Sequence, residues 1–116
     1  MAITRFGGNA INARVVIHGG VAYLSGIVAD DKSAGIADQT RQILAKIDKH
    51  LADAKTSKSK LLSAIVYLSD MSKKEEMNAV WSSWIDAANP PVRACVGAEL
   101  SSPSTLIEIM VTAAVD

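Results

Sequence analysis

The sequence predicts an α+β domain in which two helices cover one face of a mixed β-sheet. The chain alternates between short stretches rich in strand-forming residues and two segments whose apolar residues recur with helical spacing. Glycine and proline pairs separate several of these stretches, as expected of turns. The 116 residues suit one domain, which we take to span residues 1–116.

The N-terminal part is predicted to be β-structure. Residues 3–6, ITRF, suit a short leading strand, and residues 14–26, RVVIHGGVAYLSG, are rich in strand formers. Gly19 and Gly20 interrupt the second stretch at its middle. Paired glycines suit the tight turns that join antiparallel strands, so residues 14–26 are predicted to form a β-hairpin.

The apolar period changes at Ser33, where a helix is predicted to begin. Charged residues fall away from the apolar face of this segment, as in an amphipathic helix packed on a sheet. Asp30, Asp31 or Ser33 is expected to cap its start. The residues that share the inner face are Ile36, Thr40, Ile43, Leu44, Ile47 and Leu51.

A strand and a second helix are predicted next. Residues 60–70, KLLSAIVYLSD, are apolar on both faces, which indicates a strand buried between two layers. Ser72 followed by Glu75 is typical of a capping box at a helix start. The asparagine and prolines at 89–91 end the helix, since proline cannot continue one. The predicted inner stripe is Met77, Val80, Trp81, Trp84 and Ile85.

The chain is predicted to end in a second hairpin. Residues 92–100 and 105–115 suit strands, and SSPS at 101–104 suits the turn between them. With both helices on one face of the sheet, the other face keeps apolar residues that no helix is left to cover. We therefore expect a subunit interface to cover it.

Charge and cysteine content exclude several classes of protein. Twelve basic and twelve acidic residues balance, so no overall field attracts nucleic acid or an anionic membrane. No apolar run approaches the roughly 20 residues of a membrane span, and the N-terminus lacks the apolar core of a signal peptide. One cysteine cannot form an intrachain disulfide. We expect a soluble cytoplasmic protein.

Arg93 stands out because it lies in an apolar strand. Arg93 and Cys95 would share one strand face, with Val92, Ala94 and Val96 on the other. A guanidinium there needs a partner, from the protein or from a ligand. The predicted C-terminal hairpin would bring Cys95 near Glu108, with a register uncertain by about two residues.

Two interpretations of these residues stay open at this point. Arg93 and Glu108 can be a structural ion pair, with Cys95 as packing. Alternatively, the arginine binds the carboxylate of a small acid, and the glutamate orients or deprotonates a water that attacks it. The two histidines and the cysteine have no spacing typical of metal ligands, so we expect no metal.

Five stretches, in order along nearly the whole chain, resemble the RidA (YjgF) family of imine deaminases. They are VAYLSG at 21–26, AIVYLSDM at 64–71, Asn78 within EEMNAVWSSW, PPVRACVGAEL at 90–100 and LIEI at 106–109. The second helix and PPVR look closest to a less-studied bacterial branch of that family.

The resemblance implies a chorismate-mutase-like fold and a homotrimer with three sites in clefts between subunits. It implies hydrolysis of reactive enamines and imines, such as 2-aminoacrylate and 2-iminopropanoate, to 2-keto acids and ammonia, with no metal or organic cofactor. The partner is then a small imine or keto acid that bears a carboxylate. The alternatives are a trimer that binds 2-keto acids without catalysis, or a chaperone-like interaction protein.

The resemblance also implies roles for individual residues. Arg93 would hold the substrate carboxylate, and Glu108 would position the attacking water. Three further residues, Cys95, Ser25 and Gly26, would line the pocket, with Gly26 letting the backbone approach the ligand.

The N-terminal segment departs from the family pattern. Asn78 matches a family asparagine near the site, but the tyrosine that well-studied members carry before the first hairpin strand is missing. Asn12 is its nearest match in position, and Arg14 is close by.

Overall fold

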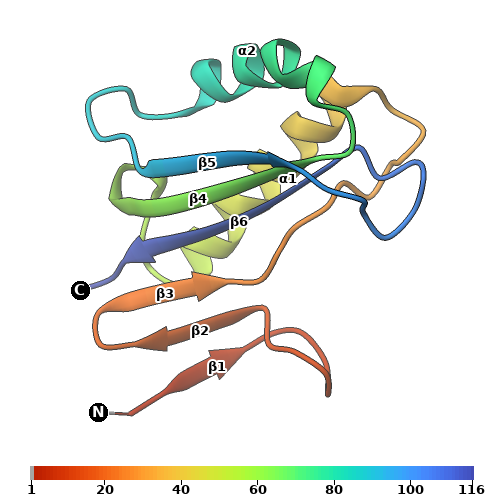
Figure 1. Cartoon of the computed structure of the whole chain (residues 1–116). Coiled ribbons are helices and arrows are strands. Elements are labelled where there is room, and N and C mark those ends of the chain that lie inside the picture. The colour runs from red at the N-terminus through yellow and green to blue at the C-terminus, as the bar shows by residue number, and fades with distance from the viewer. Residues whose placement is uncertain (1) are drawn as a thin grey trace.

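A computed structural model describes residues 2–116 of the chain. It contains one six-stranded sheet with the strand order β1-β2-β3-β6-β4-β5 and two α-helices (Figure 1). Short 3₁₀ turns at Lys58–Lys60 and Met71–Lys73 precede β4 and α2. The elements are β1 Thr4–Phe6, β2 Val15–His18, β3 Val21–Leu24, α1 Ile36–Asp53, β4 Leu61–Leu68, α2 Lys74–Trp84, β5 Val92–Gly97 and β6 Ile107–Ala114.

The N-terminal β-structure is as predicted. β2 and β3 pair antiparallel, with Ile17 opposite Ala22, and β1 adds a short edge strand beside β2. Gly19 and Gly20 form the connection, with φ angles of 60° and 79°. Left-handed backbone at both central residues is what a tight hairpin turn requires, and glycine adopts it without steric cost.

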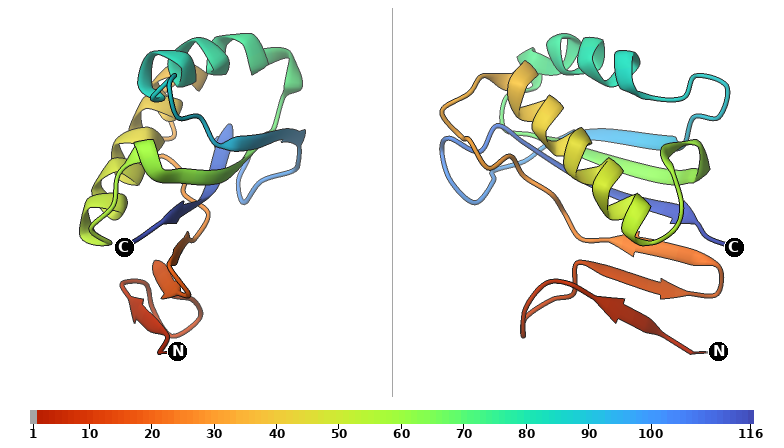
Figure 2. Two further views of the ribbon diagram at one scale, coloured as in Figure 1. Left: turned by 90° about the vertical axis from the view of Figure 1, so that its left-hand side faces the viewer. Right: turned by 180° about the vertical axis from the view of Figure 1, so that it is seen from behind.

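Both helices lie on one face of the sheet, which confirms the predicted α+β architecture (Figure 2). Ile43 and Ile47 of α1, Met77 of α2 and Ile109 of β6 are fully buried between the layers. Burial of such a side chain contributes about 1.5–3 kcal/mol. Neither helix of residues 2–116 is long and apolar enough to cross a membrane.

The predicted C-terminal hairpin is wrong. β5 runs parallel to β4, whereas β6 runs antiparallel to β4 on its other side, so β4 separates β5 from β6. The connection from β4 through α2 returns the chain parallel to β4, as helical crossovers do. The following loop passes the end of β4, where the Ala98 N–H donates to the Leu68 carbonyl (3.0 Å) and the Ser69 N–H to the Leu106 carbonyl (3.1 Å).

Both helices begin differently from the prediction. Gly35 is the N-cap of α1 and provides no side-chain hydrogen bond, whereas Asp31 accepts from the Ser33 N–H (3.0 Å) in the preceding turn. Near α2, Asp70 rather than Ser72 supplies the capping oxygen, since it accepts from the Ser72 N–H at 3.0 Å. The predicted capping box of Ser72 and Glu75 is therefore absent. α2 ends at Trp84, before the prolines.

One face of the sheet is open, as expected from the prediction that no helix is left to cover it, so within a single chain β4 is buried only on its helix-facing side. Ile65 of β4 is 37% exposed and Met110 of β6 is 43% exposed. They lie opposite each other in the β4–β6 register, on the face away from the helices. Tyr23 and Val96 are also exposed on this face, here called the open face.

Candidate functional site

Glu108 lies on the open face beside the backbone of Gly26. The carboxylate is so near that a Cβ added to Gly26 would overlap Glu108 Oε2 and lie 3.0 Å from Cδ. Two backbone hydrogen bonds hold the segment there: Ile27 N–H to Ile109 O (2.9 Å) and Ile109 N–H to Ile27 O (3.0 Å). Half-buried Tyr67 lies opposite Glu108 on β4. The structure thus brings two of the predicted site residues, Gly26 and Glu108, together.

Arg93 lies on the opposite, helix-facing side of the sheet. It pairs in register with buried Ala64 and reaches α2, where its Nη2 donates to Asn78 Oδ1 at 2.8 Å. The guanidinium also lies over the Trp81 ring, 5.1 Å from the centroid, as in a cation–π contact. Arg93 and Asn78 are therefore together as well. The role of Trp81 was missed, because its place on the helix stripe predicted packing alone.

The predicted approach of Cys95 and Arg93 to Glu108 is wrong. Cys95 pairs with Val66 on the helix-facing side, half-buried against the core. Strand alternation places Glu108 on the other face, with β4 between. The ion pairs of residues 2–116 join Arg41 to Asp38, Lys46 to Asp30 and Lys60 to Asp116. The structural Arg93–Glu108 ion pair is thus excluded within this chain.

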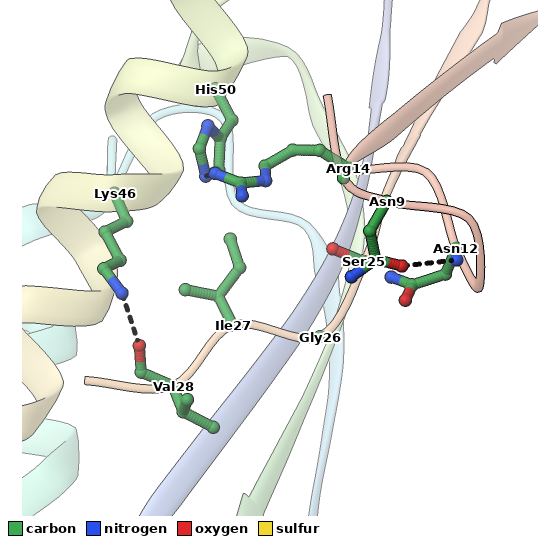
Figure 3. A pocket seen from close by; sticks show the side chains of 10 residues that line it. Asn9, Asn12, Arg14, Ser25, Gly26, Ile27, Val28, Lys46 and His50 are labelled. Atoms are coloured by element: carbon green, nitrogen blue, oxygen red, sulfur yellow. Dashed lines mark hydrogen bonds between the residues drawn. The ribbon is translucent and has the colours of Figure 1, made fainter. Parts of the chain in front are cut away.

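A pocket of about 250 Å³ lies between the loop at 8–12, the segment at 25–28 and α1 (Figure 3). Ser25, Gly26 and Asn12, three predicted site residues, line it together. Asn9 orders the loop, since its Oδ1 accepts from the backbone N–H groups of Ile11 (2.8 Å) and Asn12 (3.3 Å). Asn12, the nearest match in position to the missing family tyrosine, therefore lines a pocket in the structure.

Two basic side chains meet in this pocket, and sequence reasoning missed their contact. Arg14 Nη1 lies 3.3 Å from His50 Nε2. Because arginine only donates, His50 Nε2 accepts, and the ring is the neutral Nδ1–H tautomer. Burial and the Arg14 charge lower the pKa of His50. A signal existed: His50 follows Ile47 by three residues, on the apolar stripe of α1.

Residues 2–116 hold no group of three His, Cys, Asp or Glu side chains arranged to bind a metal ion. The candidate site residues form three separate groups within the chain, namely Arg93 with its amide partner Asn78, Glu108 beside Gly26, and the polar pocket beside α1. Such groups can bind a carboxylate and orient a water.

Comparison with known proteins supports one family over the whole chain. Residues 8–115 match the family described as endoribonuclease L-PSP. A RutC family protein of Haemophilus ducreyi is 42% identical over 104 residues, which cover 90% of this chain and 89% of that protein. The RutC family protein YoaB of Escherichia coli is 36% identical over 115 residues, which cover 99% and 100%.

Solved structures agree with this relationship. A crystal structure of a YjgF family protein from Neisseria meningitidis is 39% identical, with a TM-score of 0.94 over 100% of this chain and 97% of that chain. Yeast Mmf1, at 20% identity and a TM-score of 0.90 over 99% and 100%, shares the fold. The sequence resemblance is confirmed: the chain belongs to the RidA (YjgF) family, which includes proteins described as endoribonuclease L-PSP and RutC.

Proposed function

We propose that the protein hydrolyses short 2-imino acids, such as 2-iminopropanoate formed from 2-aminoacrylate, to 2-keto acids and ammonia. Water adds to the C=N carbon, the nitrogen takes up protons, and the C–N bond breaks to release ammonia and leave a carbonyl. The reaction is spontaneous, so positioning and proton transfer are sufficient catalysis. The chain belongs to a family that also contains proteins described as endoribonucleases, but its net charge of zero does not favour RNA as substrate.

The observation that carries the proposal is a pair of uncompensated charges. Arg93 and Glu108 are both half-buried, and neither forms an ion pair within residues 2–116. Arg93 is held by neutral groups, the Asn78 amide and the Trp81 ring, so its full charge is available to a carboxylate. A half-buried arginine with no carboxylate beside it is suited to bind an anionic ligand.

The placement of the two charges supports a site shared between subunits. Within one chain they lie on opposite faces of the sheet, so one small molecule cannot contact both. Arg93 is on the edge strand β5, where a second copy can approach it, and the open face carries exposed Ile65, Met110 and Val96. We propose a homotrimer whose clefts combine Arg93 of one subunit with Glu108 of another.

In such a cleft, Arg93 binds the substrate carboxylate and fixes the imine carbon. Glu108 accepts a hydrogen bond from water and directs its oxygen at that carbon. Gly26 leaves room for the carboxylate of Glu108 and exposes backbone to the ligand. Ser25 and Asn12 line the adjoining pocket. One half-buried cysteine, Cys95, suits the reducing cytoplasm that we propose as its compartment.

The test is a coupled assay in which 2-aminoacrylate is generated in the reaction mixture. The wild type should accelerate keto-acid formation, and Arg93→Ala should abolish most of the acceleration. Arg5→Ala is the matched control, because exposed Arg5 on β1 is far from these residues in sheet order. Light scattering on the same samples should give the mass of a trimer. A stable monomer would overturn the shared site.

A second candidate is a trimer that binds 2-keto acids without catalysis. It is favoured by one observation, that Asn12 rather than tyrosine lies in the pocket with Ser25 and Gly26. An inactive wild type that binds pyruvate, with the binding lost in Arg93→Ala, would select this candidate.

A further inference from the structure

The pocket beside α1 has a charge pattern that the proposed reaction does not use. Its lining includes three basic side chains, Arg14, Lys46 and His50, and no carboxylate. Arg14 precedes β2, and Lys46 and His50 lie on two successive turns of α1. Arg14 and His50 point toward each other, whereas Lys46 reaches the Val28 carbonyl (Figure 3). At neutral pH the positive charges are those of Arg14 and Lys46, and two cations that line one hollow repel each other unless an anion binds between them.

Of the two charged side chains in this pocket, Arg14 is the one with no ion-pair partner among residues 2–116. No carboxylate of residues 2–116 lies within ion-pair distance of it. Its side-chain contact is with His50, a neutral acceptor that uses one N–H of Nη1. A guanidinium has five N–H donors, so most of them are left for a ligand.

His50 fixes the place of Arg14 without reducing its charge. The ring is held on α1, and its residue is only 7% exposed. Burial, first, and then Arg14, Lys49 and Lys46 lower the pKa of His50, whereas Asp53 raises it. The neutral ring therefore accepts the hydrogen bond from Arg14 at neutral pH.

Lys46 supplies a second, partly compensated charge at the other end of the pocket. Its Nζ donates to the Val28 carbonyl at 2.9 Å and to Asp30 at 2.6 Å. Asp30 lies outside the pocket lining, and its side chain is 86% exposed. The cavity, about 250 Å³ in volume, equals roughly eight water molecules at ~30 Å³ each. This space suits a small metabolite rather than a polymer.

From these contacts we propose that Arg14, supported by His50, binds the oxyanion group of a small metabolite in this pocket. The ligand class is a carboxylate or a phosphate, since both accept the paired N–H donors of a guanidinium. Asn12 and Ser25 add polar groups to the same lining, and the Ser25 N–H donates to the Arg14 carbonyl at 3.0 Å. The anion contact uses Arg14 rather than Arg93 or Glu108, although Asn12, Ser25 and Gly26 of this pocket also belong to the cleft proposed above for imine hydrolysis.

The first test uses the unmodified protein and its two histidines. Their ring resonances are followed by NMR as inorganic phosphate, and separately succinate, is added at constant ionic strength and at about pH 7.5, where an ordinary histidine is mostly neutral. We expect saturable movement of the His50 resonance and a rise in its pKa, because a bound anion offsets the Arg14 charge. His18, exposed on β2, is the internal control and should stay in place.

The second test compares two variants with the same change in charge. Calorimetry with the same anions should show binding at least about tenfold weaker in Arg14→Gln, the loss expected for a charged hydrogen bond. Arg5→Gln should bind like the wild type. His50→Gln, which keeps an acceptor for Arg14, should bind more tightly than His50→Leu.

The two anions identify the chemistry of the ligand. Saturation by phosphate alone assigns a phosphate group, and saturation by succinate alone assigns a carboxylate. Movement of both histidines together, equal weakening in Arg14→Gln and Arg5→Gln, or no saturation by either anion at millimolar concentration would overturn the proposal.

Discussion

The carboxylate of Glu108 occupies the space that a side chain at position 26 would need. A Cβ on Gly26 would overlap Oε2 of Glu108 and lie 3.0 Å from its Cδ and 3.4 Å from its Cγ. The two backbone hydrogen bonds between Ile27 and Ile109 prevent the strand-end segment from moving away as a whole. Glycine at 26 and glutamate at 108 are thus sterically coupled across two elements.

Gly26→Ala should therefore remove catalysis while leaving the fold stable. The clash involves the far end of a flexible side chain, so Glu108 can rotate away at little cost to stability, but its carboxylate leaves the position beside Gly26. We expect turnover in the imine assay to fall by roughly 10²-fold, the size of a typical general acid–base contribution. Thermal unfolding should change little. Gly35→Ala, where nothing lies within 4 Å of the new Cβ, is the control.

Replacing Arg93 should mainly weaken ligand binding, whereas replacing Glu108 should mainly slow turnover. Arg93→Ala removes a charged partner worth roughly 1.5–3 kcal/mol per hydrogen bond, so pyruvate should bind about tenfold more weakly or worse. Glu108→Gln should keep most of that affinity while turnover falls by roughly 10²-fold or more.

Calorimetry and the imine assay on the same two variants separate these roles. Because no ion pair joins the residues, Glu108→Gln should not loosen Arg93. Loss of pyruvate binding in Glu108→Gln would contradict the assignment of water positioning.

Cys95→Ser should keep much of the activity. The thiol lies half-buried on β5, on the same strand face as Arg93, where it packs against the core. Imine hydrolysis needs water and no thiolate, so a hydroxyl of similar size should be tolerated. Complete loss of turnover in a variant that remains folded and binds pyruvate would give the thiol a chemical role.

Local patterns explain which parts of the fold were predictable. Gly19 and Gly20 between two strand-forming runs predicted the first hairpin, and the apolar stripe predicted α1, because both signals lie within a few residues. The turn signal at 101–104 led to the wrong prediction of a hairpin, because a local signal does not show which strands pair. The pairing of β5 with β4 depends on the α2 crossover between them, which no local window contains.

The same difference between local signals and long-range contacts explains which parts of the candidate site were predictable. Asn78 and Arg93 were singled out separately by resemblance, and the structure joins them through one hydrogen bond. Predicting that Arg93 and Glu108 lie on opposite faces would have needed the strand order, which the sequence pattern does not contain. Arg14 and His50 are 36 residues apart, so their contact depends on how α1 packs beside β2.

His50 should make stability depend on pH. Its pKa in the folded protein lies below the ordinary 6.5, chiefly because of burial and then Arg14. The unfolded chain therefore takes up a proton at higher pH than the folded one, so the free energy of unfolding should fall as pH decreases through about 6.5.

Urea unfolding at several pH values measures this effect. His50→Gln should show a smaller loss of stability between about pH 7.5 and 5.5 than the wild type. His18→Gln, at an exposed position, should retain the full loss. An unchanged pH slope in His50→Gln would contradict the assignment.

The shared site predicts that two inactive variants can restore each other. Arg93→Ala and Glu108→Gln subunits, mixed in equal amounts and reassembled by refolding, form mixed trimers. A cleft works when its Arg93 comes from a Glu108→Gln subunit and its Glu108 from an Arg93→Ala subunit, which random assembly gives in about one cleft in four. We therefore expect about a quarter of wild-type turnover from the mixture, far above either variant alone. If both residues of a working site came from one subunit, every cleft would lack one of them and the mixture would stay inactive. A control mixture of Arg93→Ala with Arg93→Ala,Glu108→Gln subunits should also stay inactive, because no cleft can contain Arg93.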